Sequence, residues 1–379
     1  MEEVKRMDLL DWVGADAAAR VLMGLDDPAD LVRATCVSKS WSRFVIANGF
    51  CKKLCVRMCP EVLIFTHVIE EGSSAEVADV GSSSSDEWAS MEREHRVYSC
   101  LSHHLISRLA KADCISEPIG ASSTDNYPEE SVDYTLEPTD RVELRPSYWS
   151  SKGETDPRVP EKLTYRLNSN LCVVTEIKIQ PFKAYFQIGN PVYSALAVLF
   201  RMGYPKLAQE ATAEEYSSRQ EVTDDNYIWT YVSPEFPMLQ ESNLQSFKLP
   251  RPVLCIGGIV QIELLGRVQK QDIDGLYYIC VCHVKVIGRK LAPLFDSNIL
   301  HCNKGIPVLQ YFPDMRVSTT PETQETEDRS KSSWQAFAMR IRELRWNRAI
   351  LNTLLGAIPI IVDDYNDGPD EEPELEPPT

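Results

Sequence analysis

The sequence predicts an α+β multidomain chain, in which a helical module is followed by an antiparallel β-sandwich and, near the C-terminus, by an amphipathic helix. The first part of the chain places apolar side chains at helical spacing, whereas the central part alternates apolar and polar residues between Pro and Gly. A Ser-, Gly- and Glu-rich stretch between them is typical of a linker. The predicted parts are a helical module (8–66), a flexible acidic and Ser-rich linker with a short helix (67–111), the sandwich (112–290), a loop region (291–332), a helix (333–362) and a disordered acidic tail (363–379).

Capping residues divide the first module into three short helices. Asp16 can cap the first, and the pair Asp27-Pro28 provides a cap with proline at the first helical position of the second. Ser38 or Ser40 can cap the third. Three short helices bury little surface alone, so we expect this module to need a partner or a neighbouring domain.

The sandwich is predicted from alternating strands. Residues 171–180 end with apolar and polar side chains on opposite faces. Residues 253–265 and 276–287 flank a loop that contains the turn-forming pair Asp274-Gly275, which predicts that these two strands pair antiparallel.

Residues 20–41 read RVLMGLDDPADLVRATCVSKSW and are similar to the F-box consensus, in which a Leu-rich helix precedes a Leu-Leu pair and a Val-Cys/Ser-Lys/Arg-x-Trp ending. This resemblance implies that the module lays an apolar face on the Skp adaptor of a Skp–cullin–F-box ubiquitin ligase. The positions matching those that face the adaptor in the family are Val21, Leu22, Leu31, Val32, Val37 and Trp41. The consensus opens with Leu-Pro where this chain has Ala15-Asp16, and the alternative is a helical cap whose apolar residues pack only internally.

A second resemblance covers the start of the sandwich. The order Ala-Ser-Ser, Pro-Glu, Tyr-Trp-Ser-Ser and Gly resembles the opening of discoidin-type domains, which are galactose-binding-like jelly rolls. The matching positions are Ala121, Ser122, Ser123, Pro128, Glu129, Tyr148, Trp149, Ser150, Ser151 and Gly153. Taken together, the two resemblances make the whole chain similar to plant-type F-box proteins that carry a galactose-binding-like jelly roll after the F-box.

The second resemblance implies a binding module whose ligand sites lie on loops at one end. Aromatic residues cluster near such loops, and the candidates for contact with a client protein are Tyr148, Tyr185, Tyr193 and Tyr231. Trp149 is structural in the related domains, and we expect it to be structural here.

Composition and motifs narrow the function classes. The net charge of −17 argues against a nucleic-acid partner, and no apolar run is long enough to span a membrane. Cys51, Cys55 and Cys59 recur every four residues, a spacing that fits no usual zinc site and indicates a packed helix face. The odd number of cysteines (11) and the lack of a signal peptide indicate the cytoplasm or nucleus. We predict no metal, no cofactor and no catalytic site.

The sequence therefore predicts a substrate-recognition adaptor of a Skp–cullin–F-box E3 ubiquitin ligase, a non-catalytic subunit that holds an unknown client through its jelly roll. Its partners would be the Skp adaptor and, through it, a cullin. The alternative is a non-catalytic glycan- or lipid-binding protein outside the ubiquitin system. The amphipathic helix near the C-terminus is expected to pack on the sandwich or on the helical module.

Overall fold

The computed structural model describes residues 9–72, 84–107, 110–142, 145–206, 226–298 and 307–315, which all belong to one compact unit, Met1–Val317. The predicted helix over 333–362 and the predicted acidic tail over 363–379 lie outside the described residues. Among the helices that the structure describes, none is long and apolar enough to cross a membrane.

The helical module is confirmed, and side-chain caps begin two of its helices, α3 and α4. It consists of α1 (Leu9–Val13), α2 (Ala15–Met23), α3 (Pro28–Thr35), α4 (Lys39–Ala47), α5 (Phe50–Met58) and the 3₁₀ helix η1 (Pro60–Ile64). The Asp27 carboxylate accepts a hydrogen bond from the Ala29 N–H at 2.9 Å, and the Ser38 hydroxyl accepts one from the Trp41 N–H at 3.2 Å. The predicted cap at Asp16 is wrong, because α2 begins at Ala15, two residues before the predicted start, and its N-cap is Gly14 with a positive φ of 83°.

A long helix completes the module. Helix α6 (Ser84–Ile106) packs along α5 and buries Val97, Tyr98 and Leu101. Cys55 is buried at this contact, where its thiol donates to the Tyr98 carbonyl oxygen at 3.3 Å. All three cysteines of α5 and its C-cap are at most 1% exposed, as a packed helix face requires, and burial raises the pKa of Cys51 to about 11.

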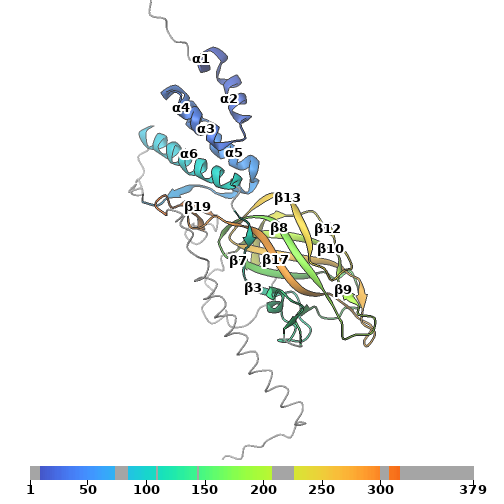
Figure 1. Cartoon of the computed structure of the whole chain (residues 1–379). Helices are drawn as coiled ribbons and strands as arrows, with labels where there is room; N and C mark the ends of the chain where they lie inside the picture. The colour runs from blue at the N-terminus through green and yellow to red at the C-terminus, as the bar shows by residue number, and fades with distance from the viewer. Residues whose placement is uncertain are drawn as a thin grey trace, which may run out of the picture. The chain divides into compact units, whose positions relative to one another are not determined.

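Two antiparallel sheets form the sandwich (Figure 1). The first sheet has the order β11 (Tyr227–Val232), β10 (Ala195–Pro205), β14 (Ile259–Arg267), β7 (Glu161–Leu167) and β3 (Ile115–Ala121), with β12 (Phe236–Pro237) beside β10. The second has the order β13 (Gln245–Ile256), β8 (Leu171–Lys183), β17 (Cys280–Lys290) and β2 (Ala112–Asp113), with β6 (Trp149–Ser150) beside β17 and β9 (Val192–Tyr193) beside β8. From β7 to β17 the chain passes back and forth between the sheets, as in a jelly roll, and the predicted fold class is confirmed.

Several short elements lie in the loops between the sandwich strands. They are η2 (Val132–Leu136), the hairpin of β4 (Arg141–Val142) with β5 (Arg145–Pro146), and the hairpin of β15 (Gln269–Lys270) with β16 (Tyr277–Tyr278). The core between the sheets contains Trp149, Phe200 and Ile262, all fully buried. Strand alternation is as predicted in β8, where Ile177 and Ile179 are buried and the residues between them are partly exposed.

The predicted pairing of 253–265 with 276–287 is wrong. The chain turns at Gly257 and Gly258, with φ of 85° and 67°, so the first stretch divides between β13 and β14 in different sheets. A β-carbon at Gly258 would lie 2.8 Å from the Ser169 carbonyl oxygen, so this turn also requires glycine for space. Strand β17 pairs instead with β8, β6 and β2.

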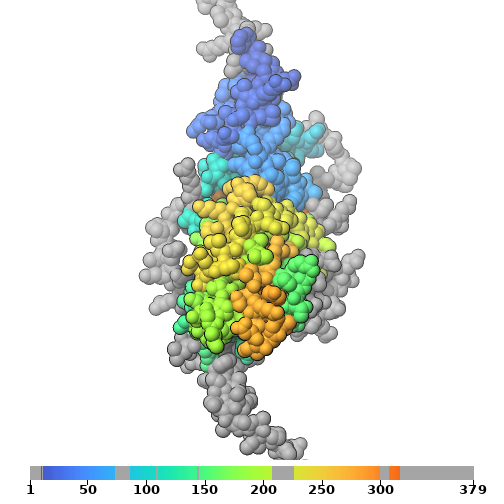
Figure 2. All heavy atoms as spheres, turned by 90° about the vertical axis from the view of Figure 1, so that its right-hand side faces the viewer, coloured from blue at the N-terminus to red at the C-terminus, as the bar shows by residue number. Residues whose placement is uncertain are grey.

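A small third sheet contains residues that we predicted to be linker or loop. Strand β1 (Val68–Glu70) pairs parallel with β19 (Val308–Tyr311), which pairs antiparallel with β18 (Phe295–Asn298). Phe295 and Leu309 are fully buried in the same hydrophobic core as the helical module. That core also includes Val173 and Leu254 from the sandwich, so apolar packing is continuous between the helices and the sheet beside them. Figure 2 shows the helical module, in blue, directly against the sandwich residues in yellow.

Candidate functional site

The helical module exposes an unusual number of apolar side chains. Six large hydrophobic residues within 12–37 are more than a third exposed: Trp12, Val13, Val21, Met23, Val32 and Val37. They come from α1, α2, α3 and the turn after α3. Single exposed apolar residues are common on protein surfaces, but a local concentration of them marks a surface for association.

The structure divides the six predicted adaptor-facing residues into three groups by their exposure. Val21, Val32 and Val37 are 66%, 41% and 62% exposed and are available to a partner. Leu22 and Leu31, only 5% and 1% exposed, are part of the core of the module. Trp41 is half-buried and packs against that core. None of these positions tests adaptor binding itself, which stays a prediction.

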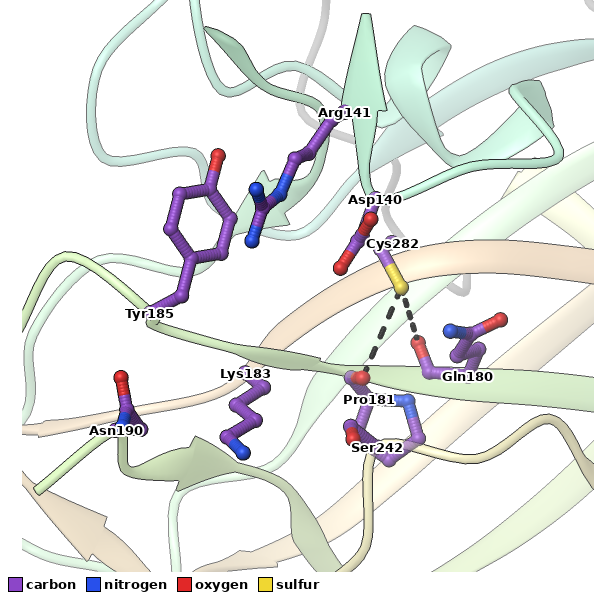
Figure 3. Close-up of a pocket in the computed structure, with 9 residues that line it drawn as sticks. All are labelled: Asp140, Arg141, Gln180, Pro181, Lys183, Tyr185, Asn190, Ser242 and Cys282. Atoms are coloured by element: carbon purple, nitrogen blue, oxygen red, sulfur yellow. Dashed lines mark hydrogen bonds between the residues drawn. The ribbon is translucent and has the colours of Figure 1, made fainter. Parts of the chain in front are cut away.

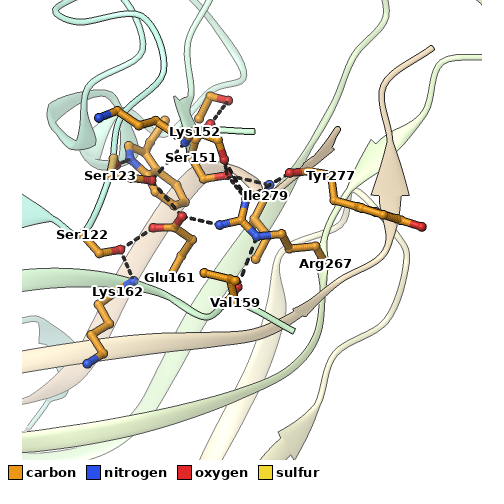
Figure 4. Close-up of polar contacts among 12 residues, drawn as sticks. Ser122, Ser123, Ser151, Lys152, Val159, Glu161, Lys162, Arg267, Tyr277 and Ile279 are labelled. Atoms are coloured by element: carbon orange, nitrogen blue, oxygen red, sulfur yellow. Dashed lines mark hydrogen bonds and ion pairs between the residues drawn. The ribbon is translucent and has the colours of Figure 1, made fainter. Parts of the chain in front are cut away.

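At one end of the sandwich, a buried ion pair organises the loops (Figure 4). Arg267 at the end of β14 pairs with Glu161 at the start of β7, and their side chains are 0% and 4% exposed. The guanidinium also donates to the carbonyl oxygens of Lys152, Tyr277 and Val159 at 2.7, 3.0 and 3.1 Å. Because these partners lie in three separate stretches of chain, around residues 152, 159–161 and 277, the pair fixes the loops relative to the strands.

The residues of the discoidin-type resemblance support this network. The Ser122 and Ser123 hydroxyls both donate to the Glu161 carboxylate, and the Ser151 hydroxyl accepts from Arg267 at 3.0 Å. Trp149 is fully buried, and its indole N–H donates to the Ser123 carbonyl oxygen at 3.0 Å. The expectation that Trp149 is structural is confirmed.

The last residues of β8 and the turn that follows it, together 180–187, separate two cavities. Residues on one side of the extended chain, Pro181, Lys183 and Tyr185, line a cavity of about 300 Å³. Residues on the other side, including Phe182 and Phe186, line a cavity of about 150 Å³. Through Lys183 this follows from the alternation of side chains along β8, and Tyr185 and Phe186 lie in the turn after the strand.

The larger cavity carries both signs of charge (Figure 3). The Arg141 guanidinium lies 3.7 Å from the centre of the Tyr185 ring, in cation–π geometry. Lys183 and Asp140 also line this cavity. The cavity can therefore accept polar groups of a ligand, without a marked preference for positive or negative charge.

The smaller cavity is aromatic and acidic. The Tyr148 and Phe182 rings stack with centroids 3.9 Å apart, and Tyr193 and Tyr278 also line the cavity. The Tyr148 hydroxyl donates to the Glu130 carboxylate at 2.6 Å. Burial, followed by the effect of Glu130, raises the pKa of Tyr148, so this hydroxyl keeps its proton.

Three of the four predicted client-binding tyrosines therefore lie around the segment 180–187, and the fourth does not. Tyr231 is on β11, where the Arg251 guanidinium lies 5.4 Å from its ring centre, beside η1 of the helical module. Client binding by any of the four is not tested by these positions and stays a prediction.

Over 371 aligned residues the chain is 41% identical to the F-box protein At4g00755 of Arabidopsis thaliana, and the match covers 95% of each chain. The chain belongs to the F-box protein family. The predicted family is confirmed by this relative. A scan against protein-family models found no match to the chain.

The jelly roll of this F-box protein is similar to carbohydrate-binding modules of known structure. One is CBM32-3 from a family 31 glycoside hydrolase of Clostridium perfringens, at 11% identity over 46% of this chain and 90% of that chain, with a TM-score of 0.30. Another is the family 32 module from Streptococcus pneumoniae EndoD, at 12% identity over 46% and 98%, with a TM-score of 0.30. At these scores neither likeness bears on what this F-box protein binds.

Sequence reasoning missed the acidic side of the smaller cavity in this F-box protein. Asp125 and Glu130 line it, although the sequence analysis did not single them out as ligand-binding groups. Their only signal in the sequence is a position near the predicted loops, because residues 125, 182 and 278 meet only through the pairing of distant strands.

Proposed function

We propose that this F-box protein is the non-catalytic substrate-recognition subunit of a Skp–cullin–F-box E3 ubiquitin ligase. The observation that carries the proposal is the exposed apolar surface of the helical module in a chain of this family. A surface that exposes Val21 and Val37 by 66% and 62% gains hydrophobic free energy when a partner covers it.

From their burial we propose different roles for the adaptor-facing positions of the family. Val21, Val32 and Val37 are proposed to contact the Skp adaptor directly. Leu22 and Leu31 are proposed to act indirectly. They are buried in the core and fix the helices that present the exposed residues. Trp41 packs on the same core and can contribute its remaining exposed part.

The jelly roll is proposed to bind a client protein at the end that contains the two cavities. Loops on a rigid scaffold are a common location for recognition, and the Arg267–Glu161 pair supplies the rigidity here. Binding of adaptor and client by one chain raises the local concentration of client lysines near the ubiquitin-conjugating enzyme. The chain then acts through proximity and carries out no bond-making step.

The test is a pull-down of a purified Skp adaptor by the full chain and by the variant Val37→Asp. Placing a carboxylate in an apolar interface costs several kcal/mol, so the variant should lose binding by at least about 100-fold. Since Val37 is 62% exposed, its substitution should leave the thermal unfolding midpoint unchanged.

A matched control is Val232→Asp, which changes a valine of similar exposure (55%) on β11 of the sandwich. This control should bind the adaptor like the unmodified chain. Absence of adaptor binding by the folded, unmodified chain would overturn the proposal. Equal loss of binding in both variants would show that the exposed helical residues are not the contact surface.

A further inference from the structure

The smaller cavity at the loop end has the size of a site for one side chain. Its volume is about 150 Å³, whereas pockets that enclose a whole small molecule usually measure roughly 300–1,000 Å³. Its walls come from segments far apart in the sequence: the loop around Asp125, the strand end at Tyr148, the segment after Phe182 and the β16 residue Tyr278. The network around Arg267 holds three of these segments in place.

The charge of this cavity has one sign. Asp125 and Glu130 are its charged lining residues, and Asp274 lies next to it, where it accepts a hydrogen bond from the Tyr278 hydroxyl at 2.5 Å. No ion pair joins any of these three carboxylates to a cation within the described part of the chain. Burial and the Asp274 charge raise the pKa of Asp125, which Lys152 only partly offsets, so the site disfavours further negative charge.

Among the uncharged lining residues, aromatic side chains lie beside polar ones such as Asn126 and Gln187. Tyr148, Phe182, Tyr193 and Tyr278 border the cavity, and Phe186, which is 54% exposed, stands at its edge. Aromatic faces attract cations through the ring quadrupole, and the attraction grows when the cation is shielded from water. Carboxylates and aromatic rings around one small space therefore select the same kind of ligand, an ammonium or guanidinium group.

We infer that this cavity is a recognition site for the side chain of a lysine or arginine in the client protein. The inference rests on the proposed function and specifies the chemistry of the client. Asp125 and Glu130 provide the charge attraction, and the exposed ring of Phe186 packs against the aliphatic stem. The larger cavity, which contains Arg141 and Lys183, has no such preference and receives a neighbouring part of the client.

The rim of the cavity favours a peptide as the carrier of this cation. Two exposed apolar side chains directly follow lining residues in the chain, Tyr127 (54% exposed) and Ile188 (101%), and Ile273 (89%) lies two residues after the lining residue Gln271. They would contact apolar residues on either side of the basic residue. An anionic membrane surface is disfavoured, because Asp125, Glu130 and Asp274 would repel its headgroups.

The test measures binding of fluorescein-labelled peptides Ala-Leu-X-Leu-Ala to the full chain by fluorescence polarisation, where X is Lys, Arg, Gln or Glu. The Lys and Arg peptides should bind at least about tenfold more tightly than the Gln peptide, and the Glu peptide should bind most weakly. Added NaCl should weaken binding of the Lys peptide and leave binding of the Gln peptide unchanged, because salt screens the attraction between exposed charges.

The variant Asp125→Asn/Glu130→Gln should abolish the preference for Lys and Arg. Both replacements keep the shape of the side chain, and the glutamine oxygen can still accept from Tyr148. The matched control Glu117→Gln/Glu235→Gln removes two carboxylates that do not line the cavity and should retain the preference. Asp125→Asn alone, an exposed substitution, provides a second variant in case the double variant unfolds.

Three outcomes would overturn the inference. The first is equal binding of all four peptides by the folded, unmodified chain, and the second is a preference that survives in Asp125→Asn/Glu130→Gln. The third is binding of galactose at this end of the sandwich, while the Lys and Arg peptides bind no more tightly than the Gln peptide. Because the same variant should still bind the Skp adaptor, failure here is distinguishable from failure of the proposed function.

Discussion

Arg251 on β13 donates two hydrogen bonds to the carboxylate of Glu61 in η1, at 3.0 and 2.5 Å. The contact fastens the helical module to the sandwich through a paired guanidinium and carboxylate, the geometry that gives the strongest charge-assisted bonds. Glu61 is almost fully buried, with its side chain 2% exposed, whereas the Arg251 side chain is 33% exposed. The buried carboxylate therefore depends on this one arginine for its ion pair.

Removing that arginine should destabilise the protein. In Arg251→Ala the Glu61 charge stays buried without its cation, and we expect a loss of about 2 kcal/mol, between the values for exposed and buried pairs. The measurement is urea unfolding followed by circular dichroism. As a control, Arg166→Ala breaks a pair with Glu117 whose partners are 51% and 60% exposed, and it should cost less than about 1 kcal/mol. Equal losses of unfolding free energy in the two variants would show that the burial of Glu61 does not increase the stabilisation by its ion pair.

Substitution in the pair between Arg267 and Glu161 should reduce stability more than substitution of Arg251. Both side chains are at most 4% exposed, so Arg267→Met leaves a buried carboxylate and several carbonyl oxygens without their donor, at a cost of about 3–5 kcal/mol. Adding Glu161→Gln removes the uncompensated charge and should recover part of the loss. Differential scanning calorimetry of the single and double variants tests this. A double variant less stable than Arg267→Met would contradict the explanation by charge.

His283 should make the protein sensitive to acid. The residue is 4% exposed, its Nδ1 lies 3.1 Å from the Thr135 carbonyl oxygen, and burial, followed by the Lys285 charge, lowers its pKa below the ordinary value of 6.5. The unfolded chain then binds a proton that the folded chain does not, so stability falls as the pH drops from 6.5 towards the lower, folded-state pKa.

The variant His283→Asn keeps a donor near the Thr135 carbonyl and removes the titration. Its stability should fall less steeply than that of the unmodified chain when urea unfolding is measured between pH 7 and pH 5. His67→Asn, at an exposed position, is the matched histidine control. Identical pH profiles for the unmodified chain and His283→Asn would show that another group causes the acid sensitivity.

What the sequence alone determined is mostly local. Asp27, Pro28 and Ser38 set helix starts because a cap depends on neighbouring residues only, and these predictions are confirmed. The alternation in β8 predicted its buried face for the same reason. The motif in residues 20–41 also identified the family, since that signal is carried by a short run of adjacent residues.

Only the tertiary structure decided which segments meet. The Gly257–Gly258 turn sends β13 and β14 to different sheets, and a sequence in which both halves look like one strand does not show this. The strands of the third sheet were likewise missed, because β1 and β19 pair across more than 200 residues of chain. Tertiary contacts also separated Val37, which is exposed, from Leu31, which is buried, although both are apolar residues of the same motif. The reason is that burial and pairing depend on the surroundings that distant segments provide, and a cavity such as the one beside Phe182 exists only after they have packed.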